Sequence, residues 1–337
     1  MSKNNQFDYE ELNYAIDKIA HWYKKNIKIL NIITVPFNTS YIFSDIINEI
    51  SMQGGKVLYV WGNNRENREL LTLLREINQD ITYSYIECGK GITNLTFANE
   101  RNLGLIRGNY DLIIFDDIGY FSNIDNLNIR NKIDICSVLS NKIIFYGIEK
   151  TTLNGELIEI LPYNCEKPFV EPRILTTRIN LSLDIPYNLY EYLKWFVNMK
   201  KKVAIYTPDK EKLNLVYEYF ENQLVMKDVK AIKVSKVEEF KRCSRVLKYK
   251  DKAIFIITDK VKELSEYCFV NDAVVLFADD IRYTYKKIMY LCGKIGQINK
   301  ELPEVLLVSN SISEDIDKAK SVLREYNKKV WEKNLKI

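Results

Sequence analysis

Short apolar runs alternate with amphipathic segments along the first half of the chain. Five runs have the length of a buried strand and are listed by range: 27–35, 56–61, 82–87, 111–115 and 142–146. Residues 8–26, 40–52 and 64–78 repeat their apolar positions with helical spacing, and a further helix is expected between 87 and 111. Strands that alternate with helices predict a parallel sheet covered on both faces.

The second half repeats this order of elements. It follows a segment, 162–172, that holds three prolines in eleven residues and has little periodicity. The expected strands and extended segments are 173–180, 202–206, 253–258, 273–277 and 304–308, and the expected helices are 187–200, 213–220, 284–292 and a last one that ends near 333. Ser311 and Glu314 form a candidate capping box for that last helix.

Two domains of one type follow from this repetition. The sequence predicts an N-terminal helix over 1–26, a first domain over 27–165, a linker over 166–175, and a second domain with a C-terminal helix over 176–337. A chain of 337 residues is long enough for two such cores.

Composition excludes several kinds of site. Six cysteines without C-x-x-C spacing, and a single histidine, His21, argue against zinc ribbons, multi-histidine metal sites and histidine-based triads. The 49 basic and 45 acidic residues leave a net charge of +4, so nucleic acid would need a locally basic groove. No apolar run reaches the roughly 20 residues of a membrane span, and the first residues are polar and acidic, so a cytoplasmic protein is expected.

Two acids close the apolar run 112–115. Asp116 and Asp117 stand where a Walker B strand carries its carboxylates. Asp116 would then reach Mg²⁺ through water, and Asp117 would orient an attacking water. The alternative is that they cap a helix or solvate a loop.

If the first domain binds a nucleotide, the segment after the first expected strand should bind its phosphates. It reads Thr34-Val35-Pro36-Phe37-Asn38-Thr39-Ser40-Tyr41 and holds neither glycine nor lysine, which a P-loop requires. Asn38, Thr39 and Ser40 could attract an anion weakly at the start of a helix, or serve as a simple N-cap.

With these features the chain resembles the superfamily 2 helicases over residues 27–330, and the ComFA-type late-competence ATPases in particular. The string 116–119 stands where that family has its D-E-x-D box, 202–208 resembles motif IV, and 291–297 resembles the G-R-x-G-R of motif VI. The resemblance implies two tandem RecA-like domains, each a mostly parallel sheet with helices on both faces. It also implies ATP and Mg²⁺ as cofactors and single-stranded DNA as a partner.

The departures from the family pattern all remove groups that ATP hydrolysis needs. Ser40 replaces the phosphate-binding lysine, Asp117 replaces a glutamate, and Lys294 and Gln297 replace two arginines of motif VI. Loss of such an arginine costs about 10³–10⁵ in rate. We therefore expect deficient ATP hydrolysis, with Asn38, Thr39, Ser40 and Lys294 lining a degenerate cleft in which nucleotide binding without turnover stays open.

The resemblance also places nucleic acid across both domains. Candidate contacts combine positive charge with an aromatic face, and they are Arg65, Arg68, Lys90, Lys210, Lys260, Tyr285 and Lys286. Each could equally be a solvated surface residue. The favoured function is a helicase-like, nucleic-acid-binding protein in DNA uptake or processing. The alternatives are a pseudo-ATPase scaffold for a protein partner and, with less support, a two-domain sugar-nucleotide transferase.

Overall fold

A computed structural model describes residues 3–63, 65–86, 93–119, 126–150, 155–161, 168–224, 226–249, 251–267, 270–298 and 303–335. The chain forms two compact units, Met1–Pro168 with Lys328–Ile337, and Phe169–Asn327. The division in the C-terminal part falls within the last helix, α10 (Glu314–Leu335). No helix in the described ranges is both long and apolar enough to cross a membrane.

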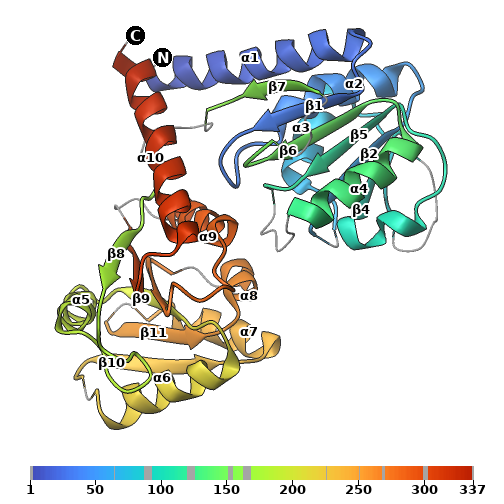
Figure 1. The fold of residues 1–337 in the computed structure, drawn as a ribbon. Coiled ribbons are helices and arrows are strands. Elements are labelled where there is room, and N and C mark those ends of the chain that lie inside the picture. Colours follow the sequence, from blue (N-terminus) through green and yellow to red (C-terminus); the bar gives the residue numbers. More distant parts are fainter. Residues whose placement is uncertain are drawn as a thin grey trace. The chain divides into compact units, whose positions relative to one another are not determined.

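The described part of the first unit contains a seven-stranded sheet in the order β3-β4-β2-β5-β6-β1-β7 (Figure 1). Its strands are β1 (Ile29–Ile33), β2 (Val57–Trp61), β3 (Tyr83–Ile86), β4 (Leu95–Asn99), β5 (Leu112–Asp116), β6 (Ile143–Gly147) and β7 (Glu156–Glu159). Its helices are α1 (Lys3–Lys24), η1 (Tyr41–Phe43), α2 (Ser44–Met52), α3 (Arg68–Ile77), η2 (Glu100–Leu105) and α4 (Asn126–Leu139). Each recorded pair of neighbouring strands is parallel.

The second unit contains a six-stranded parallel sheet in the order β10-β11-β9-β12-β13-β8, again within the described ranges. Its strands are β8 (Arg173–Thr176), β9 (Lys202–Tyr206), β10 (Val229–Val234), β11 (Ala253–Thr258), β12 (Asp272–Leu276) and β13 (Val305–Ser309). Its helices are α5 (Tyr187–Asn198), α6 (Lys210–Asn222), α7 (Val237–Val246), α8 (Val261–Tyr267), α9 (Tyr285–Ile298) and part of α10.

The central strands of both sheets are continuous apolar runs because helices cover both of their faces. All five residues of β2, β5 and β6 are buried. In the second unit Val203, Phe255 and Leu306 belong to one buried cluster with helix residues such as Leu193. The expected pair of parallel α/β sheets is confirmed.

Two local expectations were wrong. In place of a helix between 87 and 111, the described residues form β4 followed by the short 3-10 helix η2. Buried Thr96 and Asn99 break the apolar run of β4, so its pattern does not identify a strand. The cap of α10 is Ser313, whose Oγ accepts from the Ile316 N–H over 3.3 Å, and the Ser311 hydroxyl donates instead to Asp279.

Candidate functional site

The structure gathers the first set of candidate residues at the carboxyl edge of the first sheet, where ligands bind in open parallel sheets. The segment after β1 supplies Asn38, Thr39 and Ser40, and the end of β5 supplies Asp116 and Asp117. One contact joins these segments directly, because the Phe37 N–H donates to the Ile118 carbonyl over 2.9 Å. The Asp117 N–H donates to the carbonyl of Tyr146 on β6, the strand between β5 and β1, over 2.8 Å. Strands β5 and β1, on either side of β6, thus bring the predicted Walker B and phosphate-loop positions to the same part of the edge.

Both oxygens of the Asp116 carboxylate accept hydrogen bonds from the protein itself. Its Oδ2 accepts from the Tyr59 hydroxyl over 2.5 Å. Its Oδ1 accepts from the N–H groups of Ile118 over 2.9 Å and Gly119 over 2.6 Å. Burial raises the pKa of Asp116, and these hydrogen bonds act in the opposite direction. Asp116 is only 2% exposed, so it is a structural acceptor rather than an open ligand.

Three backbone N–H groups in the loop after β1, those of Phe37, Thr39 and Tyr41, also have protein acceptors. A P-loop directs such groups at phosphate. Here the Thr39 N–H donates to Asn38 Oδ1 over 2.9 Å and the Tyr41 N–H donates to Thr39 Oγ1 over 3.1 Å. The Phe37 N–H is bonded to Ile118, as described above, and Phe37 has a φ of +60°. Three donors that could face an anion therefore face protein oxygen atoms.

Side-chain hydrogen bonds also link the residues of this region to one another. Asn67 Nδ2 donates to Ser40 Oγ over 3.2 Å and to the Tyr59 hydroxyl over 3.4 Å, which links the phosphate-loop position to Asp116 through two residues. The Tyr146 hydroxyl donates to the Thr39 carbonyl over 2.9 Å. Ser40, Asn67 and Asp116 are each less than 7% exposed, so water has little access to this network.

An acidic side chain lies beside the loop. Thr39 Oγ1 donates to Glu69 Oε1 over 3.3 Å. Desolvation raises the pKa of Glu69, and the charge of Asp116 adds to that rise. Two carboxylates near the position of a triphosphate would repel it, and no lysine is present in residues 34–41 to offset them.

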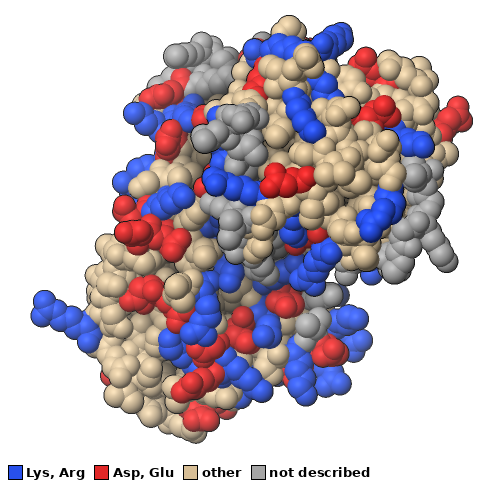
Figure 2. All heavy atoms as spheres, turned by 45° about the vertical axis from the view of Figure 1, so that its right-hand side comes forward, with Lys and Arg blue, Asp and Glu red and all other residues tan. Residues whose placement is uncertain are grey.

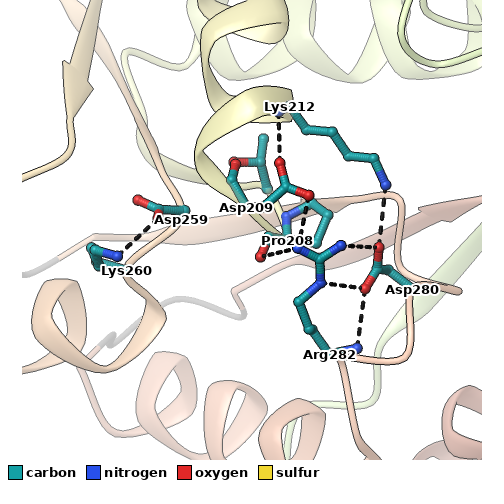
Figure 3. Close-up of polar contacts among 8 residues, drawn as sticks. Pro208, Asp209, Lys212, Asp259, Lys260, Asp280 and Arg282 are labelled. Atoms are coloured by element: carbon teal, nitrogen blue, oxygen red, sulfur yellow. Dashed lines mark hydrogen bonds and ion pairs between the residues drawn. The ribbon is translucent and has the colours of Figure 1, made fainter.

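The carboxyl edge of the second sheet carries a network of paired charges (Figure 3). Arg282 donates from Nη1 to Asp209 Oδ2 over 2.7 Å, and from Nε and Nη2 to the two oxygens of Asp280 over 2.8 and 3.0 Å. Lys212 Nζ reaches Asp280 Oδ2 over 3.2 Å. Although burial opposes it, the hydrogen bonds from Arg282 and Lys212 lower the pKa of Asp280 to about 2.

Other predicted contacts in the second unit lie in different surroundings. Lys260 follows β11 and pairs with Asp259 over 2.9 Å, whereas Lys210 is exposed at the first turn of α6. Tyr285 and Lys286 are 8% and 6% exposed, and the Lys318 ammonium lies 3.6 Å from the centre of the Tyr285 ring. That ring is therefore not open for stacking with a base.

The remaining predicted residues are divided between the units. Arg65 and Arg68 are exposed beside the carboxyl end of β2, and Arg68 pairs with Glu66 over 3.7 Å. Lys294 is half-buried on α9, and Lys90 lies outside the described residues. On the face drawn in Figure 2, basic and acidic side chains are interspersed.

Sequence reasoning missed Tyr59, Asn67 and Arg282. Tyr59 lies inside an apolar run, and nothing in that run marks its hydroxyl as the partner of Asp116. Asn67 had a detectable signal, because its Oδ1 caps α3 by accepting from the Leu70 N–H over 3.1 Å. Arg282 follows two acids in the chain, but its bond to Asp209 depends on the packing of β9 beside β12.

The sheet orders and their carboxyl-edge loops define tandem RecA-like domains, the fold of the superfamily 2 helicases. Two solved structures of Escherichia coli HrpB share it. The crystal structure of the DExH-box NTPase HrpB matches with a TM-score of 0.52 and 12% identity, over 95% of this chain and 42% of that chain. The crystal structure of the DEAH/RHA helicase HrpB matches with a TM-score of 0.50 and 13% identity, over 92% and 43%.

These likenesses concern the fold, and the chain spans about two fifths of the HrpB chains. No family model matches the sequence, and no curated protein matches it.

Proposed function

We propose that this chain is a helicase-like, ComFA-type protein that binds single-stranded nucleic acid, does not hydrolyse ATP at a useful rate, and acts in DNA uptake or processing. The observation that carries the hydrolytic deficiency is the Asp116 carboxylate, which accepts three hydrogen bonds from Tyr59, Ile118 and Gly119. A Walker B carboxylate has to face the water shell of Mg²⁺ instead.

The residues at this edge do not fit a magnesium triphosphate. The N–H groups of Thr39 and Tyr41 are bonded to side chains of the same segment, and Glu69 adds negative charge. Asn38, Thr39 and Ser40 accordingly act as structural residues in this proposal, and ATP and Mg²⁺ are not resident cofactors.

The nucleic-acid part of the proposal is supported by the fold and by exposed cations at the carboxyl edges of the sheets. Arg65 and Arg68 follow β2, and Lys210 follows β9. Because phosphate contacts release counterions, binding through these residues would weaken as salt is raised. Arg282 and Lys212 contribute less, since a phosphate would first have to displace Asp280 and Asp209.

The test is a titration of labelled single-stranded DNA at low and high salt, with and without ATP and Mg²⁺, while phosphate release is followed. We expect salt-sensitive binding without phosphate release. The variant Arg65→Ala, Arg68→Ala, Lys210→Ala should bind roughly tenfold more weakly and show a shallower salt dependence. Its matched control replaces Lys227, Lys248 and Lys252, exposed at the amino edge of the second sheet, by alanine.

Two outcomes contradict the proposal. DNA-stimulated phosphate release at the rate of a working motor would overturn the hydrolytic deficiency. Equal loss of binding in the test and control variants, or no binding at low salt, would overturn the assigned interface.

A protein scaffold is a second candidate, favoured by apolar side chains that are exposed around α5. Leu183 and Tyr187, four residues apart and just before and at the start of α5, are 70% and 71% exposed. Such groups are typical of an association surface when they lie together. If this function holds, a tagged chain should recover a partner without nucleic acid, and Leu183→Asp with Tyr187→Asp should abolish that recovery. Undiminished recovery by that variant would argue against this surface.

A further inference from the structure

The strand β10 lies at one edge of the second sheet. It pairs in parallel with β11 from Val229 to Val234, and among the described residues no strand pairs with its other edge. An open strand edge presents a row of backbone donors and acceptors to which another chain can add.

The register shows which backbone groups face outward. The Ala253 N–H on β11 donates to the Asp228 carbonyl over 3.2 Å. Because the N–H and C=O of successive residues point to alternate sides of a strand, the groups of Lys230 and Ile232 also face β11. Those of Val229, Ala231 and Lys233 therefore face the open edge.

A groove of about 460 Å³ runs along this edge and carries an excess of positive charge. Its lining includes Lys230 and Lys233 on the strand, Tyr217 on α6, and Arg242 and Glu239 on α7. The single acid is already engaged, because Glu239 Oε2 accepts from the N–H groups of Ser235 over 2.9 Å and Lys236 over 3.1 Å. Both strand lysines are exposed, and Lys233 Nζ lies 5.5 Å from the centre of the Tyr217 ring.

We propose that β10 is a docking edge for an extended, acidic segment of a protein partner, which adds to the sheet as a further strand. The outward backbone groups would bind its main chain, and Lys230, Lys233 and Arg242 would pair with its carboxylates. This surface is separate from the nucleic-acid interface proposed above, and its occupancy does not depend on that function.

Two other occupants fit less well. A second copy pairing through its own β10 would bring together two edges that each carry Lys230, Lys233 and Arg242, and these like charges repel one another. A phosphodiester backbone has no N–H donors for the outward carbonyl groups of Val229, Ala231 and Lys233. An acidic peptide satisfies both the charge and the hydrogen-bonding pattern.

The experiment uses the full chain and two labelled ten-residue peptides, one alternating Glu and Val and the other alternating Lys and Val. Fluorescence anisotropy measures binding, and hydrogen exchange measures protection of the Ala231 and Lys233 amides. We expect the acidic peptide to bind at least about tenfold more tightly than the basic one and to slow exchange at both amides.

Variants test separately the contributions of side-chain charge and of backbone hydrogen bonds to peptide binding. Lys230→Glu with Lys233→Glu should reverse the preference between the peptides. The control, Lys241→Glu with Lys248→Glu, makes the same charge change at exposed positions outside the groove lining and should leave the preference unchanged. Ala231→Pro removes one outward donor, which an edge strand tolerates, and should weaken the acidic peptide by about tenfold at an unchanged melting temperature.

Equal binding of both peptides would overturn the proposal, as would binding that leaves exchange at Ala231 and Lys233 unchanged. Displacement of the peptide by a single-stranded oligonucleotide from this edge would assign it to nucleic acid instead. Self-association that is lost on reversing Lys230 and Lys233 would assign it to a second copy.

Discussion

The hydroxyl of Tyr59 on β2 donates to the carboxylate of Asp116 on the neighbouring strand β5 over 2.5 Å. Both residues are almost fully buried. Burial, with the charge of Asp116 beside it, raises the pKa of Tyr59 well above its ordinary value, so the phenol keeps its proton and remains a donor. The carboxylate that we propose as a Walker B remnant thus accepts a hydrogen bond from a neutral hydroxyl on the next strand.

Tyr59→Phe should destabilise the first unit because it removes one of the three hydrogen bonds to a buried carboxylate. A bond to a charged group contributes roughly 1.5–3 kcal/mol, and urea unfolding measures the loss. Tyr110→Phe is the matched control: Tyr110 is also buried, and its hydroxyl has no hydrogen-bond partner among the described residues. We expect Tyr110→Phe to change stability by less than about 0.5 kcal/mol. Equal effects of the two changes would mean that the Tyr59 bond contributes nothing specific.

Gly119→Ala should destabilise the same carboxylate from the other side. A Cβ at residue 119 would lie 2.2 Å from Asp116 Oδ2, well inside contact distance, so the turn or the carboxylate has to move. Overpacking of this kind costs about 1–3 kcal/mol. Gly104→Ala provides the control, because a Cβ there meets no atom within 4 Å and the residue is not in the left-handed region. Thermal unfolding of both variants should show a loss for Gly119→Ala alone.

The strands that the sequence predicted correctly are those whose own residues show that they are buried on both faces. Runs such as 112–115 and 253–257 are apolar throughout because both faces are covered, and their pattern is visible in the sequence. The strand β10 was not predicted, since its lysines at 230 and 233 interrupt the apolar pattern at a solvated edge. Likewise the Tyr59–Asp116 contact depends on which strands are neighbours, and local sequence does not specify that.

Substitution of Asn67 should destabilise the first unit because this residue both caps α3 and donates hydrogen bonds to Ser40 and Tyr59. Asn67→Ala removes the cap on the Leu70 N–H and the bonds to Ser40 and Tyr59, and should cost about 2 kcal/mol. Asn67→Ser keeps a capping oxygen but not the amide donors, so we expect about half that loss. Urea unfolding of both variants separates the two roles. Equal losses would show that the cap contributes nothing, and no loss in Asn67→Ser would show that the amide donors to Ser40 and Tyr59 contribute nothing.

The Arg282–Asp280 pair should make the second unit sensitive to acid. Burial acts to raise the pKa of Asp280, but the hydrogen bonds from Arg282 and Lys212 hold it at about 2, below its ordinary value of 3.8. A lowered folded-state pKa means that the unfolded chain binds the proton more readily. The stabilisation is therefore complete above about pH 4–5 and is lost as the pH falls toward about 2.

Asp280→Asn removes this titration. The difference in unfolding free energy between the wild type and the variant should be larger at about pH 6 than at about pH 3, by about 1 kcal/mol after allowance for solvent screening. Urea unfolding across this range measures the difference. A constant difference for Asp280→Asn would show that its carboxylate has the same pKa in the folded and unfolded chain.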